Sequence, residues 1–263
     1  MAHEALADLA ERLATEAGRR LERAVIVERT LVETKTTGTD MVTETDRATE
    51  AFLVEGILAA RPDDAVVGEE GADHAGTSGV TWLIDPIDGT TNFVYGLPGF
   101  NVSVAAEIDG SMVAGVVVDP LHGDVFRAVL GAGATRNGRP IRVNAPTDLA
   151  MALVATGFGY DPVRRRHQAE VLNDVLPVVR DIRRIGAAAT DLCWVACGRV
   201  DAYFEKGLQP WDYAAGGLVA AEAGAVVTDL DGGPTSSAFT LAAPPGIVDG
   251  FRALLRHAGA ADV

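Results

Sequence analysis

Acidic side chains follow three apolar runs of this sequence. Glu69 closes the run in "VVGEE", Asp85 and Asp88 close "WLIDPID", and Asp212 lies in "LQPWDYAAGG". A single buried acid is most often a helix cap or one half of an ion pair. None of these four has a lysine or arginine beside it in the sequence, and an unpaired buried charge is costly unless it coordinates something. As a set, the four acids therefore predict a metal site.

Magnesium is the metal that this chemistry favours. Carboxylates are hard oxygen ligands, and Mg²⁺ binds through a few of them, its own waters and the phosphate of a substrate. The carbonyl of Ile87, between the two aspartates, could add another oxygen ligand. If one carboxylate bridges two such ions, the pair could clamp a phosphate group during in-line displacement.

The residues directly after Asp88 carry groups that could bind the phosphate. Gly89 would allow the close approach of an anion, and the hydroxyl of Thr90 could orient a water molecule. If a helix begins here, its free N–H groups and its dipole favour a negative charge. A threonine cap on an ordinary helix is the alternative, and one threonine could serve both roles.

The overall charge narrows the range of partners. The chain of 263 residues has 22 basic and 37 acidic residues, and its formal net charge is -15. A field of this sign repels nucleic acid and anionic membranes, and it repels a phosphorylated substrate unless cations intervene. If the substrate is a small phosphate ester, we therefore expect metal ions where it meets the protein, and we expect no nucleic acid or membrane partner. Arginines 164–166 could form a patch for a phosphate or a partner, and arginines 183–184 an interface pair, but groups of this length are usually solvated faces.

The sequence also predicts a cytoplasmic protein. No stretch approaches the ~20 apolar residues of a membrane span, and the N-terminus lacks the basic and apolar regions of a signal peptide. Cys193 and Cys197 lie one helical turn apart, with no further Cys and no nearby His to complete a zinc site. Two buried thiols in a helix suit a reducing compartment.

The first half of the chain must position the acids and the turn that follows Asp88. Apolar residues recur at helical spacing over residues 4–27, and a second helix is predicted over residues 46–60, capped by Thr43 or Thr45. Short strands in "DAVVGEEG" and "VTWLID" lead to the acids. Further along, turns in "IDGS" and "RNGR" predict an antiparallel meander.

The second half alternates strands with helices. Strands are predicted in "ALVATGF", "IRRIG", "VDAYFEKG" and "AVVTDL", and helices over residues 162–180, 188–198, 212–224 and 246–258. Such alternation indicates a layered α/β arrangement. We therefore predict an α/β protein with two subdomains. An α+β part over residues 1–149 carries the metal and phosphate motifs, and an α/β part over residues 150–263 carries substrate residues and Asp212.

Three motifs resemble those of the inositol monophosphatase family, which comprises magnesium-dependent, lithium-inhibited sugar-phosphate phosphatases. They are "GEEG", "WLIDPIDGTTNF" and "WDYAAG", in the family's order, within a likeness that runs from about residue 35 to residue 258. Stretches such as "RRIGAAATDLCWVACGRVDAYFEKG" are similar to the bacterial, actinobacterial members. The resemblance implies a layered αβαβα sandwich, a homodimer, and a phosphomonoesterase with two or three Mg²⁺ ions in each active site.

The resemblance also implies metal ligands, residue by residue. Glu69 matches a ligand of the first metal, and the carbonyl of Ile87 matches another. Asp85 matches the carboxylate that bridges both metals. Asp88 and Asp212 match ligands of the second metal, and both also lie at the substrate in the family's sites.

Further matches concern the attacking water and the substrate. Gly89 and Thr90 match the phosphate-binding turn. Asp46 and Thr90 match a pair that positions and deprotonates the attacking water, a task in which Glu69 is a further candidate. Glu205 matches an acid that accepts hydrogens from inositol hydroxyls. The ring-contacting segment is matched by Gly186, Ala187 and Ala188.

The predicted function is therefore the hydrolysis of myo-inositol 1-phosphate and related inositol monophosphates. Within the same class, fructose 1,6-bisphosphate, histidinol phosphate and 3′-phosphoadenosine nucleotides are alternative substrates. Outside it, a regulatory protein-binding role is the alternative, because some bacterial relatives act as partners of the transcription machinery. Ala187 stands where many relatives have a hydroxyl residue, so strict selectivity for inositol is in question.

Overall fold

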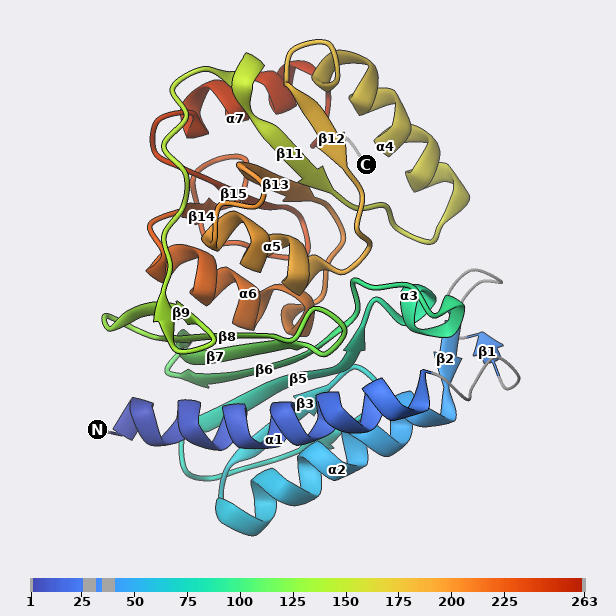
Figure 1. Ribbon diagram of the computed structural model, residues 1–263, viewed down its shortest axis with the longest axis vertical. Coiled ribbons are helices and arrows are strands. Elements are labelled where there is room, and N and C mark those ends of the chain that lie inside the picture. Colours follow the sequence, from blue (N-terminus) through green and yellow to red (C-terminus); the bar gives the residue numbers. More distant parts are fainter. Residues whose placement is uncertain (1, 26–31, 35–40, 262–263) are drawn as a thin grey trace.

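The computed structural model describes residues 2–25, 32–34 and 41–261, and it arranges them in five layers (Figure 1). Two sheets alternate with three layers of helices, so the predicted layered α/β sandwich is confirmed. The helices are α1 (Ala2–Ala24), α2 (Glu44–Ala60), α3 (Thr90–Tyr95), η1 (a 3₁₀ helix, Leu149–Met151), α4 (Pro162–Val175), α5 (Ala188–Ala196), α6 (Pro210–Glu222) and α7 (Val248–His257).

The larger sheet has eight strands in the order β10-β9-β8-β7-β6-β5-β3-β4. Its strands are β3 (Ala65–Gly68), β4 (Asp73–His74), β5 (Val80–Asp88), β6 (Asn101–Ile108), β7 (Ser111–Asp119), β8 (Asp124–Val129), β9 (Gly133–Arg136) and β10 (Arg139–Pro140). Only β3 and β5 pair in parallel; the other neighbours in this sheet are antiparallel. The predicted meander is therefore confirmed.

The smaller sheet has five strands in the order β12-β11-β13-β15-β14. Its strands are β11 (Leu153–Thr156), β12 (Asp181–Arg183), β13 (Ala202–Glu205), β14 (Val226–Thr228) and β15 (Thr240–Ala243). The pairs of β11 with β12 and β13 are parallel, whereas β15 runs antiparallel to both of its neighbours. A separate pair, β1 (Val32–Thr34) and β2 (Met41–Thr43), is antiparallel.

Each layer of helices covers an apolar face of a sheet. Helices α1 and α2 pack on the outer face of the larger sheet, through a core that includes Leu13, Leu53 and Trp82. Helices α4 and α7 cover the outer face of the smaller sheet. The middle layer, α5 and α6, lies between the two sheets and contacts both.

Small residues allow the middle layer to pack closely. A Cβ atom added to Gly115 of β7 would lie 3.0 Å from the backbone of Ala215, and one added to Gly216 would lie 3.0 Å from the Cα of Ala189. Such distances leave little room for side chains between α6, the larger sheet and α5. The small residues of the run "AAGG" therefore let α6 pack closely on the larger sheet. Asp212, at the N-terminus of α6, lies near the ends of β5 and β6 as a result.

The sequence predicts most elements of the second half but misplaces some of their ends. The helix predicted over residues 162–180 ends at Val175, and β15 was not predicted at all. The helix predicted over residues 4–27 ends at Ala24, and residues 26 and 27 lie outside the described part of the chain. Helices α5 and α6 pack against both sheets. The division into two subdomains near residue 150 stays a prediction.

The expectations about the two cysteines and about membrane spans can also be compared with the structure. Cys193 is buried in α5, and Cys197, at the end of that helix, is half-buried; both are free thiols. Among the helices of the described residues, none is both long enough and apolar enough to cross a membrane.

Candidate active site

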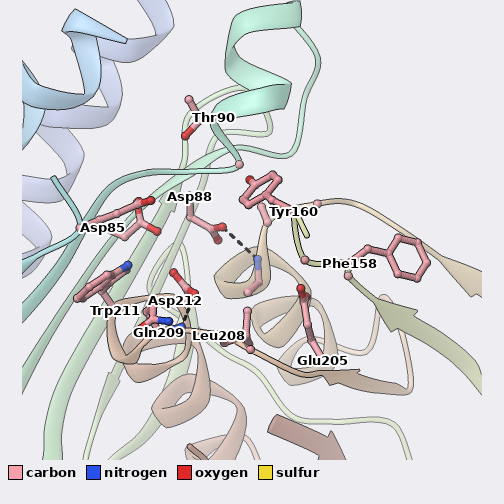
Figure 2. Close-up of a pocket in the computed structure, with 18 of the residues that line it drawn as sticks. Asp85, Asp88, Thr90, Phe158, Tyr160, Glu205, Leu208, Gln209, Trp211 and Asp212 are labelled. Carbon is pink, nitrogen blue, oxygen red and sulfur yellow. Dashed lines mark hydrogen bonds between the residues drawn. The ribbon is translucent and has the colours of Figure 1, made fainter. Parts of the chain in front are cut away.

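One cavity, of about 400 Å³, brings most of the predicted site residues together. Its walls come from the end of β5, the start of α3, the N-termini of α5 and α6, and the end of β13. Figure 2 shows Asp85, Asp88 and Asp212 at one side of it, and Glu205 and Phe158 at the other. We call the first side the acidic end (Glu69, Asp85, Asp88, Asp212) and the second the Glu205 end (Phe158, Arg164, Arg184, Glu205). Of the predicted residues, only Asp46 does not line the cavity.

The last residues of β5 hold two of the carboxylates. The strand does not stop at Asp85, as the sequence suggested, but continues to Asp88 with an irregular register between them. The Ile87 N–H donates to Asp85 Oδ1 at 3.0 Å, which closes a tight local turn. Both aspartates are buried, so the strand end presents its charges to the cavity rather than to bulk solvent.

A left-handed glycine connects β5 to α3. Gly89 has φ 90°, and a Cβ atom there would lie 2.9 Å from the Gly99 carbonyl oxygen, so this position requires glycine. Gly89 is also the N-cap of α3, without a side-chain cap, so the alternative of a threonine cap is wrong. Thr90 follows as the first helical residue, and its side chain is buried.

Thr90 and Asp46 meet although they are far apart in the sequence. The Thr90 hydroxyl lies 3.2 Å from Asp46 Oδ1 and 3.1 Å from the Ile87 carbonyl oxygen, two acceptors for its one hydrogen. Asp46 is buried at the start of α2, where its carboxylate accepts the Thr43 N–H in a capping box. Of the two caps predicted for this helix, Thr43 is therefore the one present.

Asp88 is held at the N-terminus of α5. Its carboxylate accepts the N–H groups of Ala188 and Ala189, at 3.1 and 2.8 Å, and the side-chain amide of Asn101 at 2.8 Å. Burial raises the pKa of Asp88 to about 6, and these donors hold it from rising further. Ala187 is the N-cap of α5, and Gly186 before it has φ 93°. The predicted ring-contacting segment thus lies directly beside Asp88.

Asp212 and Glu69 complete the acidic end. Asp212 lies in the first turn of α6, where its carboxylate accepts the Gln209 N–H at 2.7 Å. Glu69 follows β3, and its N–H donates to the Ile84 carbonyl at 3.3 Å, next to β5. Parallel pairing of β3 with β5 therefore brings Glu69 beside Asp85.

Burial and neighbouring negative charges both raise the pKa values of the carboxyl groups at the acidic end. Burial raises the pKa of Asp85 well above its usual range, and Glu69, Asp88 and Asp212 raise it further. Burial, with Asp88 as the largest charge contribution, does the same to the pKa of Asp212. Among the described residues, no ion pair relieves Asp85, Asp88 or Asp212. A positive charge placed among them would be strongly favoured.

The donor set fits a hard divalent cation better than any other group. Four carboxylates and a peptide carbonyl offer oxygen ligands only, which is the chemistry of Mg²⁺ sites rather than of zinc or copper sites. Within the described residues, no three His, Cys, Asp or Glu side chains already stand in a finished metal-binding arrangement. The fit of the acidic end to Mg²⁺ therefore rests on the close negative charges of its carboxylates and on their being oxygen ligands.

Glu205 defines the opposite end of the cavity. It ends β13, and its side chain points into the cavity (Figure 2). The buried Tyr203 hydroxyl donates to Glu205 Oε2 at 2.7 Å, and a Cβ atom at Gly157 would collide with this carboxylate in its present position. Burial raises the pKa of Glu205 to about 7, while the bond from Tyr203 and the charge of Arg184 lower it.

Sequence reasoning missed a buried acid that supports Glu69. Glu50 of α2 accepts the N–H groups of Glu70 and Ala72, at 2.8 and 2.9 Å. These bonds anchor the segment directly after Glu69. The available signal was position: Glu50 lies three residues before Leu53 and seven before Ile57, on the apolar face of the helix, where an acid is unusual.

A second missed acid lies behind the Glu205 end. Asp191 of α5 is buried, and its Oδ1 atom has no hydrogen-bond partner among the described residues. Burial, then the charges of Glu205 and Asp88, raise the pKa of Asp191 well above its usual range. An acid inside the apolar helix "AATDLCWVA" was the sequence signal for it.

Comparison with known proteins agrees with this geometry. The chain matches the inositol monophosphatase family over residues 2–260. It is 48% identical to the inositol-1-monophosphatase of Mycobacterium leprae over 274 residues, covering 97% of this chain and 94% of that protein. It is 40% identical to the Nus factor SuhB of Vibrio cholerae, with 95% and 94% covered. The crystal structure of the extragenic suppressor protein suhB from Bartonella henselae superimposes with a TM-score of 0.91 at 36% identity, over 96% of this chain and 98% of that one.

Proposed function

Because this chain belongs to the inositol monophosphatase family, a family of phosphomonoesterases, we propose that it hydrolyses myo-inositol 1-phosphate and related inositol monophosphates with Mg²⁺. The observation that carries this proposal is the single cavity that joins four carboxylates, a glycine-threonine turn and Glu205. The products are inositol and inorganic phosphate.

The acidic end would hold the metal. Glu69, Asp85 and the Ile87 carbonyl are the proposed ligands of one Mg²⁺, and Asp85, Asp88 and Asp212 those of a second; a third ion could bind nearby. Bound Mg²⁺ supplies a Lewis acid that lowers the pKa of a water molecule and neutralises charge on the phosphate oxygens. Asp85 is the proposed bridge, which agrees with its position among the three other carboxylates.

Thr90 and Asp46 would position the attacking water. When the Thr90 hydroxyl donates its hydrogen to Asp46, its oxygen lone pairs remain to accept a hydrogen bond from the water. Asp46 holds Thr90 in that orientation from outside the cavity. Glu69 is the further candidate to accept the proton. Gly89 and the N–H of Thr90 would bind the phosphate, because no Cβ hinders its approach at Gly89.

The Glu205 end would bind the polyol. An ionised Glu205 accepts hydrogens from inositol hydroxyls, and the backbone at Gly186, Ala187 and Ala188 lies against the ring. Ala187 offers no hydroxyl of its own, so Glu205 has a larger share in recognition. We also propose, from the family resemblance, a cytoplasmic homodimer that lithium inhibits.

Phosphate release is the direct test of this function. Purified protein, stripped with EDTA, is assayed with myo-inositol 1-phosphate at rising Mg²⁺ concentration. We expect no turnover without metal and full turnover at millimolar Mg²⁺. Full activity in the stripped, metal-free protein would refute a metal-dependent mechanism.

A regulatory role is the second candidate. The Vibrio cholerae relative at 40% identity is named Nus factor SuhB, a name that does not describe a phosphatase. The net charge of -15 disfavours direct RNA contact by this chain but not contact with a protein. Absence of phosphatase activity on a panel of phosphate esters, in a folded protein, would favour this role instead.

A further inference from the structure

Strand β13 carries two polar side chains on the same face. Residues two apart in a strand point the same way, so Tyr203 and Glu205 share the face toward α5, whereas Phe204 faces the outer core. Tyr203 is fully buried, and its ring packs in an apolar cluster with Leu192 and Val195 of α5. Close packing holds the ring in one place, so its hydroxyl is a donor in a fixed position.

The Tyr203 hydroxyl engages one of the two carboxylate oxygens of Glu205. It donates to Oε2 at 2.7 Å, and no hydrogen bond from the described residues reaches Oε1. Burial, and then the charges of Glu205 and Asp191, raise the pKa of Tyr203 well above its usual range, so the hydroxyl keeps its hydrogen at neutral pH. Oε1 is therefore the oxygen with both lone pairs left for a substrate.

The neighbouring strand limits where the Glu205 carboxylate can lie. Gly157 directly follows β11, and a Cβ atom there would collide with the carboxylate. Parallel pairing places Thr156 opposite Phe204, and the Thr156 hydroxyl donates to the Phe204 carbonyl at 2.9 Å. The two strands are thus held together beside Glu205, whose carboxylate contacts both the Tyr203 hydroxyl and the backbone at Gly157.

Charged groups from several elements surround Glu205. Burial raises its pKa to about 7, the bond from Tyr203 and the charge of Arg184 lower it, and the charge of Asp88 raises it. The other charged groups near it are Asp191 of α5, Asp212 of α6, Arg164 of α4 and Lys206. Arg164 and Arg184 line the cavity, so the interpretation of their groups as solvated faces does not hold for these two. Within the described chain, only Tyr203 forms a hydrogen bond with the Glu205 carboxylate.

We propose that Tyr203 is a positioning residue for substrate recognition, which fixes Glu205 so that Oε1 is the oxygen presented to a hydroxyl of the polyol. A glutamate side chain without such a bond samples several rotamers, and ordering it on binding weakens the affinity. The bond from Tyr203 orders Glu205 before the substrate arrives. This inference rests on the proposed phosphatase function, and it names a residue that sets the selectivity of that same cavity.

A merely structural role for Tyr203 predicts a different result. Loss of a structural contact lowers the stability of the protein and its activity on every substrate alike. Loss of a positioning contact changes the ratio of kcat/KM for inositol 1-phosphate to that for β-glycerophosphate, which has fewer hydroxyls. This selectivity ratio is therefore the quantity to measure.

The main test is Tyr203→Phe, which keeps the packed ring and removes the hydroxyl. At neutral pH the selectivity ratio should fall about tenfold, mainly through KM for inositol 1-phosphate, because the lost contact supports binding in the ground state as well as the transition state. Activity on β-glycerophosphate should change less than about twofold.

The pH dependence separates positioning from ionisation. Without the donor, the ionised form of Glu205 is less favoured, so the rise of the selectivity ratio with pH should move upward by about one pH unit. At about pH 9, where Glu205 is largely ionised in both proteins, at least a roughly threefold deficit should remain, because the carboxylate is still not held in place.

Three further variants serve as controls. Tyr95→Phe removes a hydroxyl from an exposed tyrosine outside the cavity and should leave the ratio unchanged. In a protein that already carries Glu205→Ala, Tyr203→Phe should have no further effect on the ratio, because the two residues act as one unit. Gly157→Ala displaces the carboxylate while Tyr203 is intact. It should lower the ratio as Tyr203→Phe does, and it carries the test if Tyr203→Phe does not fold.

The outcomes separate this inference from the proposed function. If Tyr203→Phe lowers activity on both substrates equally, leaves the ratio unchanged, or regains the wild-type ratio at high pH, positioning by Tyr203 is refuted while the phosphatase function stands. If the wild type does not hydrolyse inositol 1-phosphate, the proposed function fails. Calorimetric titration of the wild type and Tyr203→Phe with inositol 1-phosphate then takes the place of kinetics, and equal affinity of the two proteins would refute the positioning role.

Discussion

At the acidic end of the cavity, backbone groups fix the carboxylates: Asp88 accepts two N–H groups of α5, and Asp212 accepts one at the start of α6. The Glu205 end is lined by long side chains instead, and Arg164 and Arg184 form no ion pair with the part of the chain that the structure describes. Backbone anchoring ties the position of a charge to the fold itself. Under the proposed function, the architecture therefore sets the chemistry of the site, whereas a few side chains that can change independently set its selectivity.

The largest predicted effect is at the acidic end. Asp85→Asn should lower kcat at least about 10³-fold, because the proposed bridge would serve both metal ions and its loss would remove stabilisation of the transition state. In EDTA the variant should be at least as stable to heat as the wild type, because a like charge is removed from a buried cluster. Asp73→Asn, at an exposed position, is the control. More than a tenth of wild-type turnover in Asp85→Asn would show that Asp85 is not the bridge.

A variant of Glu50 tests whether the residues that position the proposed metal ligands affect Mg²⁺ binding as the ligands themselves do. Glu50→Gln keeps the shape but leaves one oxygen for the two N–H groups of Glu70 and Ala72. We expect a ten- to hundredfold loss of Mg²⁺ affinity, about the range for groups that orient metal ligands. Titration calorimetry measures this directly, with Glu55→Gln on the exposed face of α2 as the control. An unchanged affinity would limit Glu50 to a structural role.

Glu205 tests the other end. Glu205→Ala should reduce kcat/KM for inositol 1-phosphate by about one to two powers of ten, through lost charged hydrogen bonds to hydroxyls. β-Glycerophosphate, with fewer hydroxyls, should lose much less, and the Mg²⁺ dependence should stay the same. Equal losses on both substrates would place Glu205 at the phosphate or metal instead.

The pKa of Glu205, about 7, predicts a pH dependence of selectivity. As the pH rises from 6 to 8, Glu205 loses its proton and becomes the better acceptor of hydroxyl hydrogens. The ratio of kcat/KM for inositol 1-phosphate to that for β-glycerophosphate should therefore rise, by up to about tenfold. In Glu205→Gln the ratio should be flat across this range; a rise that persists would assign the titration to another group.

Lithium gives the smallest expected effect, a halving of activity at millimolar concentration. A monovalent ion beside Asp88 and Asp212 would retain product phosphate after hydrolysis, so inhibition should be uncompetitive with the substrate. Steady-state kinetics at several substrate concentrations distinguishes this pattern. Purely competitive inhibition would place lithium elsewhere.

The sequence predicted the acidic end better than the Glu205 end, for a physical reason. Asp85, Asp88 and Gly89 are consecutive or nearly so, so one local turn fixes their relation. The meander was likewise predictable, because residues Asp109 and Gly110 have φ 50° and 76°, the left-handed pair that a two-residue hairpin turn needs.

What the sequence could not supply were contacts between distant segments. Arg164 of α4 lies against Gly159 and Gly207 in the wall of the cavity, and these two glycines are far from α3 and β5 in the sequence. Strand β15 was missed for a related reason, since it enters the smaller sheet antiparallel and interrupts the alternation of strands and helices. Glu50 acts on a segment that begins 20 residues further along the chain.

The central claim, that the acidic end holds the ions on which activity depends, is tested most directly by counting them. Mn²⁺, which substitutes for Mg²⁺ and gives an electron paramagnetic resonance signal, is titrated into the wild type and into Asp85→Asn with inorganic phosphate present. We predict at least two Mn²⁺ ions bound per wild-type chain, and the loss of at least one of them in Asp85→Asn. Equal Mn²⁺ uptake by the two proteins would contradict the account.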